Sequence, residues 1–176
     1  MKNFILLLLF VFIGQQNIQA QKTTTIWVVR HAEKDTTNLK DQDPDLSPEG
    51  KERAEALSAY FGRKDLDSIF SSNYKRTRLT GFPLADKIGI TIKLYDPNTQ
   101  KAFAKELLTN AGGKKMLIIG HSNTVQELLV AFGAQKPVKE LTDEDYDYIF
   151  RLTIKGDKRE VKVDRYGKEH HSKTEN

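Results

Sequence analysis

Two histidines follow two apolar segments of the chain in the same way. Residues 25–29 run into Arg30 and His31, and residues 116–119 run into a glycine and His121. An arginine guanidinium binds phosphate oxygens as a fork, and a neutral imidazole nitrogen can attack phosphorus. Each histidine alone also fits a strand end without a function. Because the chain has only four histidines, two at equivalent positions favour one shared site for an anionic group.

The segments before these histidines determine where the side chains lie. Both runs are apolar without polar alternation, which is typical of strands buried on both faces of a parallel sheet. Open α/β sheets bind their ligands beyond the carboxyl ends of such strands. We therefore expect both histidines at the same edge of one sheet. Gly120, just before the second histidine, lets the backbone approach a ligand closely.

Helices and further strands alternate with these two segments. A helix is predicted from Ser47 as N-cap, with Pro48 at its first position, to Gly62. Strands are predicted over residues 66–72 and 88–94, and helices follow the second of these strands and His121. Alternating apolar and polar residues after position 146 turn at 155–158 and continue to position 163, which predicts an antiparallel hairpin.

A second basic cluster occupies residues 71–78. Asn73 can cap a helix, and Arg76 then lies in its first turn, where free backbone N–H groups favour an anion. Lys75 and Arg78 fit a solvated basic face better, so Arg76 is the functional candidate. Pro83 is expected to kink or end this helix. Together these elements predict an α/β fold, a three-layer αβα sandwich with a mostly parallel central sheet and an antiparallel C-terminal hairpin.

The two ends of the chain differ from the domain between them. Residues 1–20 have a basic start, an unbroken apolar run over 4–13 and a small residue at Ala20, which predicts a secretory signal peptide and export to the periplasm or medium. An uncleaved anchor is the alternative. The domain is then expected over residues 21–166. Residues 167–176 form a polar tail, in which a disordered end is favoured over metal binding by His170 and His171.

The composition excludes some classes of partner. The chain has no cysteine, so disulfides and lipoprotein attachment are excluded, and its formal net charge is +4. The basic residues are spread along the chain, so a nucleic-acid footprint is not predicted, whereas a small phosphorylated substrate is compatible with the charge. No stable membrane association is expected after signal cleavage. The sequence leaves the oligomeric state open.

The ordered motifs resemble those of the histidine phosphatase superfamily, also called phosphoglycerate-mutase-like. The resemblance extends from residue 26 to about 130 and is carried by Arg30-His31-Ala32-Glu33, Leu46-Ser47-Pro48-Glu49-Gly50, Ser72 through Arg76 to Thr80, and Gly120-His121-Ser122. It implies that His31 is the nucleophile that becomes phosphohistidine. It also implies that Arg30, Arg76 and His121 hold the phosphoryl oxygens.

The chain departs from the family pattern at two positions. Ala32 replaces the usual glycine after the nucleophile, a change familiar in small bacterial members. Ser122 replaces the aspartate that donates a proton in the acid-phosphatase and phytase branch. The chain is also short and has no room for a large cap domain, which resembles the compact phosphohistidine-phosphatase type.

The proton donor for a leaving alkoxide is open. Asp96, at the exit of the strand predicted over 88–94, is the first candidate, with a plain turn residue before Pro97 as the equal alternative. Glu33 is the second candidate. Two guanidiniums and a protonated His121 can match the charge of the phosphoryl group. No cluster has metal-ligand spacing, so no metal and no cofactor is expected.

The sequence therefore predicts a metal-independent phosphatase that hydrolyses phosphomonoesters through a phosphohistidine on His31. A phosphohistidine protein phosphatase and a phosphomutase are alternatives that the predicted export disfavours, because their partners or substrates are cytoplasmic. A catalytically inactive module that binds phosphate ligands is the alternative from another class. The intact set of Arg30, His31, Arg76 and His121 argues against it.

Overall fold

The computed structural model describes residues 22–62 and 66–172, so the predicted signal peptide lies outside the described residues. In chain order the elements are β1 (Thr24–Arg30), α1 (Pro48–Phe61), β2 (Ser68–Ser72), α2 (Lys75–Ile88), β3 (Ile92–Tyr95), the 3-10 helix η1 (Pro97–Thr99), α3 (Gln100–Asn110), β4 (Lys115–Gly120), α4 (Ser122–Ala131), β5 (Tyr148–Lys155) and β6 (Lys158–Arg165). In this part of the chain, no helix has both the length and the apolar character needed to cross a membrane.

The six strands form one sheet in the order β3-β2-β4-β1-β5-β6. Neighbouring strands among β1 to β4 are parallel, whereas β5 pairs antiparallel with β1 and β6 pairs antiparallel with β5. The mostly parallel sheet and the antiparallel C-terminal hairpin are thus confirmed. The strand that carries the first histidine lies inside the sheet, and β4, which carries the second, is its direct neighbour.

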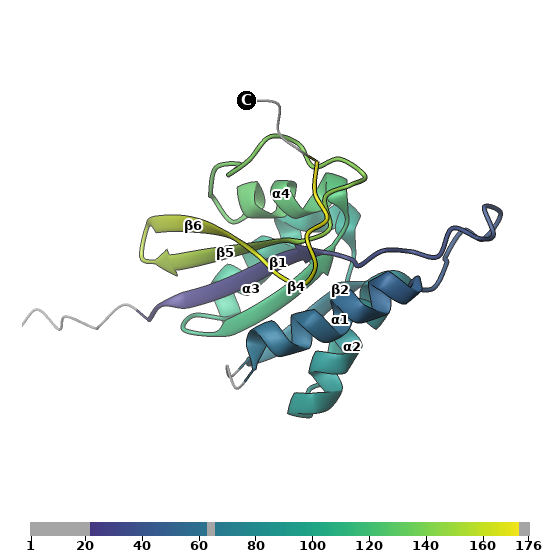
Figure 1. The fold of residues 1–176 in the computed structure, drawn as a ribbon. Helices are drawn as coiled ribbons and strands as arrows, with labels where there is room; N and C mark the ends of the chain where they lie inside the picture. The colour runs from purple at the N-terminus through teal and green to yellow at the C-terminus, as the bar shows by residue number, and fades with distance from the viewer. Residues whose placement is uncertain (1–21, 63–65, 173–176) are drawn as a thin grey trace, which may run out of the picture.

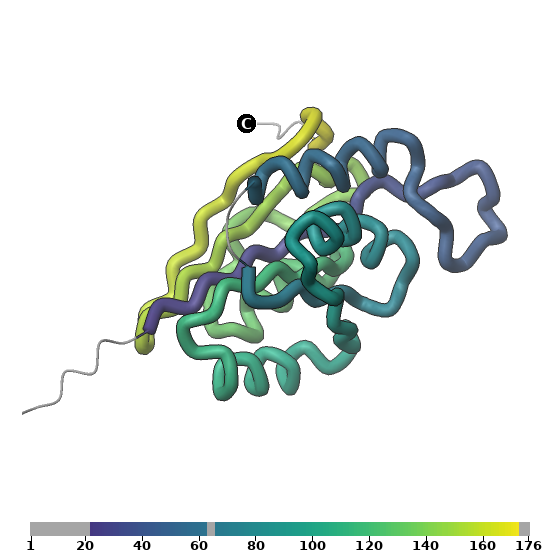
Figure 2. Tube along the Cα trace, turned by 90° about the horizontal axis from the view of Figure 1, so that it is seen from below, coloured from purple at the N-terminus to yellow at the C-terminus, as the bar shows by residue number. Residues whose placement is uncertain are grey.

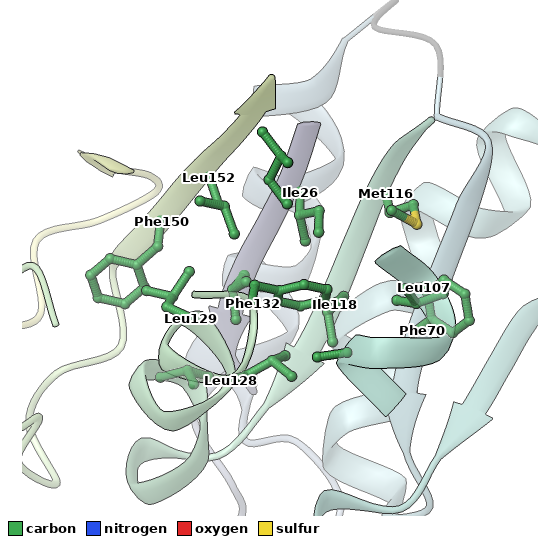
Figure 3. Close-up of a cluster of buried hydrophobic side chains, with 14 of the residues drawn as sticks. Ile26, Phe70, Leu107, Met116, Ile118, Leu128, Leu129, Phe132, Phe150 and Leu152 are labelled. Atoms are coloured by element: carbon green, nitrogen blue, oxygen red, sulfur yellow. The ribbon is translucent and has the colours of Figure 1, made fainter. Parts of the chain in front are cut away.

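Helices cover both faces of the sheet, because successive side chains of a strand point to opposite faces. Trp27 and Val29 belong to a buried cluster with side chains of α1 and α2, whereas Ile26 and Val28 belong to a cluster with side chains of α3 and α4. In the view of Figure 1, α1 and α2 lie together below the sheet and α4 lies above it. Figure 3 shows the second cluster, in which Leu128, Leu129 and Phe132 meet the sheet. The three-layer prediction is confirmed.

The helix α2 and the strand after it differ from the prediction. The helix begins after Tyr74, one residue later than expected from Asn73, and it continues through Pro83 to Ile88. Gly89 then ends it in the left-handed conformation, with a φ of 69°. A Cβ on Gly81 would lie only 2.6 Å from the Ile119 side chain, so α2 packs tightly on the sheet. This packing outweighs the one backbone hydrogen bond that the proline removes.

The edge strand β3 is correspondingly shorter than the strand predicted over 88–94 and begins at Ile92. Ile88 and Ile90 still pack against the buried cluster under α1 and α2, one from the end of α2 and the other from the turn after it. The apolar character of Ile88 and Ile90 therefore indicated correctly that they are buried, but it led to the wrong prediction of a strand. Short apolar runs do not separate a strand from a buried helix end.

The polar tail is ordered as far as the structure describes it, so the expectation of a disordered end is wrong for residues 167–172. Backbone and side-chain groups of His170, His171 and Ser172 bond to two buried aspartates, Asp145 and Asp147. Figure 1 shows the yellow C-terminal segment next to the green segment that precedes β5. Buried carboxylates need hydrogen-bond donors, and the tail supplies them. Residues 173–176 lie outside the described part.

Candidate active site

The parallel pairing of β1 with β4 brings the two histidines together. Arg30 is in register with Gly120, so the next residue of each strand is a histidine at the same edge of the sheet. The ring centroids of His31 and His121 are 5.3 Å apart. They lie beside a cavity of about 370 Å³, here called the histidine cavity, lined by Arg30, His31, Lys34, Tyr74, Arg76, Pro97, Asn98, His121, Ser122, Asn123, Thr124 and Asp143.

His31 is held as a neutral imidazole. Its Nδ1 is 2.8 Å from the carbonyl oxygen of Ala32. Because a carbonyl oxygen can only accept a hydrogen bond, Nδ1 must carry the proton, and in the neutral ring Nε2 keeps its lone pair. Burial lowers the pKa of His31 to about 3, against the opposing backbone hydrogen bond and with help from the charges of Arg30 and Arg76. The backbone N–H of Ala32 donates to the Thr80 hydroxyl at 2.8 Å and fixes the loop. An unprotonated nitrogen at neutral pH is what a nucleophile requires.

His121 is the second half of the pair. Its Nε2 is 2.9 Å from the hydroxyl of Ser72, a residue at the end of β2 to which the sequence assigned no role of its own. Burial, Arg76 and Arg30 together lower the pKa of His121 to about 4. Without a bound anion His121 is therefore neutral at pH 7. A bound phosphoryl dianion would raise this pKa, because an opposite charge favours the imidazolium.

In Arg30, the two terminal nitrogens have hydrogen-bond partners and Nε has none among the described residues. Its side chain is 5% exposed, and its Nη1 donates to the backbone carbonyls of Thr142, Asp143 and Asp145 at 2.7, 3.3 and 3.3 Å. The guanidinium carbon lies 3.9 Å from the ring centroid of Tyr146. Its Nη2 is 3.4 Å from the carboxylate of Asp143, and its Nε, although buried, has no hydrogen-bond partner. The Nε–Nη2 edge is the side of an arginine that binds an oxyanion with two bonds.

Arg76 resembles Arg30 in this respect. Its Nε is buried and unpartnered, and its Nη1 is 3.6 Å from the carboxylate of Asp43. The guanidinium lies over the ring of Tyr74, 4.4 Å from its centroid. Nε of both arginines thus has no acceptor among the described residues, and both side chains line the histidine cavity. A phosphoryl group supplies such acceptors.

The N-terminus of α4 adds a further positive element. His121 is the N-cap of this ten-residue helix, and the first three helical residues, Ser122 to Thr124, line the cavity. Helix N-termini present free N–H groups and the positive end of the helix dipole. The site therefore combines two guanidiniums, a helix terminus and two neutral imidazoles.

The two acid candidates lie in different places. Asp96 is exposed and its Oδ1 accepts from the backbone N–H of Asn98 at 2.9 Å, so it caps η1, while its neighbours Pro97 and Asn98 line the histidine cavity. Glu33 is 7% exposed and lines a different cavity, here called the glutamate cavity, of about 310 Å³. The residues of the glutamate cavity are Glu33, Glu49, Glu52, Arg53, Lys168, Glu169 and His170.

The surroundings of Glu33 keep its carboxylate ionised. Arg53 Nε donates to both of its oxygens at 2.8 and 2.9 Å, and His170 Nδ1 is 2.7 Å from Oε1. Burial alone would raise the pKa of Glu33, but the hydrogen bonds from Arg53 and His170 outweigh it and lower that pKa below its usual value. The position of Glu33 in the other cavity favours Asp96 over Glu33 as a proton donor.

Sequence reasoning missed two residues beside Arg30. Asp143 places the one carboxylate that lines the histidine cavity in the described part of the chain, and its side chain is 97% exposed. Tyr146 stacks on Arg30 from the other direction. Both belong to an irregular segment far from the motifs, and no spacing in the sequence connects them to Arg30. Within residues 22–62 and 66–172, no group of three or more histidine or acidic residues is placed to hold a metal ion.

Comparison with known proteins agrees with this geometry. Residues 26–97 match the family model of the histidine phosphatase superfamily (branch 1). Over 63 residues the chain is 41% identical to phosphoserine phosphatase 1 of Hydrogenobacter thermophilus, a stretch that makes up 34% of this chain and only 30% of that relative.

Solved structures share the fold over most of the chain. The protein histidine phosphatase SixA complexed with tungstate has a TM-score of 0.62 at 15% identity, over 81% of this chain and 95% of that one. The mycobacterial glucosyl-3-phosphoglycerate phosphatase also has a TM-score of 0.62, at 13% identity, over 82% of this chain and 99% of that one.

Proposed function

We propose that the chain is a member of the histidine phosphatase superfamily, whose family model residues 26–97 match, and that it hydrolyses small phosphomonoesters with His31 as the nucleophile. The observation that carries this proposal is one constellation. A buried imidazole with an unprotonated Nε2 lies beside a cavity at which Arg30 and Arg76 each leave a buried Nε without a partner. Donors without acceptors next to a nucleophile suit a substrate that supplies both phosphorus and oxygens.

The chemistry proceeds in two displacements at phosphorus. Nε2 of His31 forms a bond to phosphorus as the bond to the ester oxygen breaks, and the leaving oxygen takes a proton from a general acid. Water then attacks the phosphohistidine and gives a proton to the group that acted as general acid, the P–N bond breaks, and inorganic phosphate leaves. Arg30, Arg76 and the N-terminus of α4 stabilise the charge on the equatorial oxygens in both steps.

The proposed substrate is a small polar phosphate ester that the exported protein meets outside the cytoplasm. Apart from the two site arginines and histidines, polar groups dominate the lining of the histidine cavity, among them Lys34, Asn98 and Asn123. Two proteins similar to this chain are named for phosphoserine and glucosyl-3-phosphoglycerate, both polar monoesters. The signal-like residues 1–20 support export.

A phosphohistidine protein phosphatase is the second candidate, supported by the likeness to SixA over 95% of that chain. The fold of the described residues carries no inserted cap domain, and Figures 1 and 2 show the segment between β1 and α1 projecting from the domain as a plain loop. A protein substrate could approach such a site. In that case the leaving group is an imidazole nitrogen of the partner.

A substrate panel on the protein starting at Gln21 tests the proposal. We expect turnover of small phosphate esters in the presence of EDTA, and an acid-quenched reaction with labelled substrate should contain protein-bound phosphate that is acid-labile and alkali-stable. The His31→Ala variant should carry no label. Label on a serine, or activity lost to EDTA and restored by zinc or magnesium, would contradict the mechanism. Activity confined to phosphohistidine on proteins would favour the second candidate.

A further inference from the structure

Residues before β5 bind the side chain of Arg30, and residues near the C-terminus bind those residues. Residues 142–147, here called the arginine loop, contain no helix or strand, and residues 170–172, here called the strap, lie against them. The arginine loop provides the three carbonyls that bind Nη1 of Arg30. Because an irregular loop has no ladder of backbone hydrogen bonds, its shape depends on its side-chain partners.

Asp145 joins the strap to the arginine loop. Its side chain is buried, and its Oδ2 accepts from the backbone N–H and the hydroxyl of Thr142 at 2.6 and 2.8 Å. Its Oδ1 accepts from the backbone N–H and the hydroxyl of Ser172 at 3.0 and 3.1 Å. The Asp145 carboxylate thus fixes Thr142, whose carbonyl makes the shortest hydrogen bond to Arg30. The strap supplies half of the donors to this carboxylate.

Further contacts join the strap to Tyr146 and Asp147 of the arginine loop. The backbone N–H of Tyr146 donates to the carbonyl of His170 at 2.9 Å, and the Tyr146 ring lies between the His170 ring, at 5.0 Å, and the Arg30 guanidinium, at 3.9 Å. Oδ2 of Asp147 accepts from the His170 backbone N–H at 3.2 Å and is 2.7 Å from Nδ1 of His171. The strap therefore contacts each of three successive loop residues.

We propose that the strap is a positioning element of the phosphoryl site and acts through the arginine loop on Arg30. The bonds to Nη1 fix the position of the guanidinium beside the histidine cavity, which Arg30 lines. This inference rests on the proposed function, because it assigns Arg30 to the phosphoryl group. A displacement of about 1 Å in such a group can cost about 10²-fold in rate.

Deletion and point variants of the strap test the proposal. Ending the chain at Glu169 should lower kcat/KM for a phosphate ester by at least about tenfold and weaken inhibition by tungstate similarly, because both need the placed guanidinium. Ser172→Ala removes one donor to Asp145 and should lower kcat/KM by about threefold to tenfold. Lys168→Ala is the matched control: its side chain is exposed and precedes the strap without a hydrogen bond or ion pair to the strap or the arginine loop in the described part of the chain, so a change below about twofold is expected.

A double-mutant cycle separates positioning of Arg30 from general loosening of the fold. In an Arg30→Lys background the arginine loop has no guanidinium to orient, so losing the strap should cost less than about threefold. Equal losses in both backgrounds, or unchanged kcat/KM after deletion of the strap, would overturn the proposal. If the deletion variant is unfolded at the assay temperature, as judged by circular dichroism, Ser172→Ala in the two backgrounds decides.

The cycle also works if the proposed hydrolysis is wrong. Wild-type protein that turns over none of the phosphate esters would contradict the proposed function. Tungstate affinity, measured by calorimetry on the same set of variants, would still test the strap. Weakened tungstate binding that depends on Arg30 supports positioning, whereas affinity that the strap does not change refutes it.

Discussion

The loop that leaves β1 serves two cavities of opposite character. His31 lines the histidine cavity and Glu33 lines the glutamate cavity. In the second cavity the nitrogens of Arg53 are paired: Nε binds Glu33, Nη1 binds the carbonyl of Tyr166 and Nη2 binds the carbonyl of Lys168. In the first, Nε of both arginines has no partner.

This difference teaches how to separate two uses of a buried arginine. Arg53 is 4% exposed and its cost of burial is offset by carboxylate and carbonyl acceptors, so it connects α1, the β1 loop and the tail. Arg30 is equally buried and its Nη1 and Nη2 have partners, but its Nε has none among the described residues. A buried guanidinium whose donors are all paired stabilises the fold, whereas a guanidinium with an unpaired donor beside a cavity can bind a ligand there. The predictions below test this contrast.

The largest effect is expected at the nucleophile. His31→Ala should lower kcat for a phosphate ester by more than about 10⁴-fold, because no other group can form the phosphoenzyme. The free energy of unfolding at pH 7 should stay within about 1 kcal/mol of wild type, since the His31 side chain hydrogen-bonds to the neighbouring Ala32 carbonyl, and the backbone bond from His31 to Gly120 is kept in the variant. Steady-state kinetics and urea denaturation measure the two quantities. A variant that keeps a tenth of the activity would contradict the assignment.

In the glutamate cavity the expected effect is on the free energy of unfolding. Arg53→Met should lower the free energy of unfolding by about 3–5 kcal/mol, because it leaves the buried Glu33 carboxylate without its main partner. Lys51→Met, an exposed position on the same helix, is the control and should change it by less than about 0.5 kcal/mol. Urea denaturation at pH 7 measures both. An Arg53 variant as stable as this control would remove the contrast between the cavities.

The general acid should show a dependence on the leaving group. Asp96→Asn is expected to slow hydrolysis of an alkyl phosphate by about 10²-fold and barely affect p-nitrophenyl phosphate, because a nitrophenolate leaves without a proton. Glu33→Gln and Asp143→Asn, assayed on the same two substrates, identify the donor if it is not Asp96. Equal slowing of both substrates by Asp96→Asn would mean that Asp96 only positions the loop through its cap on η1.

The smallest effect concerns acid pH. Because burial holds the pKa of His31 near 3 and that of His121 near 4, both stay neutral in the free enzyme well below pH 6.5. An ordinary histidine would be only about 3% neutral at pH 5. We therefore expect kcat/KM, corrected for ionisation of the substrate, to change less than about threefold between pH 7 and 5. A drop of tenfold or more centred near pH 6.5 would show an ordinary histidine.

The same pKa values set the sign of the stability change with pH. Between about pH 6.5 and the folded-state values near 3 and 4, the unfolded chain binds more protons than the folded one. Stability therefore falls as the pH is lowered through this window. Replacing His31 with Gln removes one of the two contributions, so His31→Gln should make acid denaturation less steep than in wild type.

The sequence predicted the positions of those candidate site residues that follow from the pattern of neighbouring residues in the chain. Residues 25–29 and 116–119 are apolar because they lie inside the sheet, and their neighbours Arg30, His31 and His121 must then lie at its edge. Arg76 followed from its place in the first turn of a helix, and the one-residue shift of the cap from Asn73 did not change that. Such inferences need only contacts between near neighbours in the chain.

The sequence could not predict the contacts that depend on tertiary structure. The carbonyl of Thr142 binds Arg30 from the other end of the domain, and any residue type presents a carbonyl, so no pattern marks it. The ordered tail was missed for a related reason: polar residues after Tyr166 are equally compatible with solvent and with buried acceptors such as Asp145. The sequence also left open that Pro83 ends the helix, and it does not, because packing of α2 on the sheet, unlike helix propensity, is not local.

The central place of β1 has a consequence for the rate at which the protein folds. Thr25 of this strand pairs with Lys115 and with Thr153, so both neighbours of β1 come from much later in the chain. Loop-closure entropy must be overcome before such contacts contribute stability, which slows folding relative to helical proteins of this size. The pairing of Arg30 with Gly120 belongs to the same ladder. The two histidines therefore meet only when the slow, long-range step of folding is complete, and a chain that is still collapsing has no phosphoryl site.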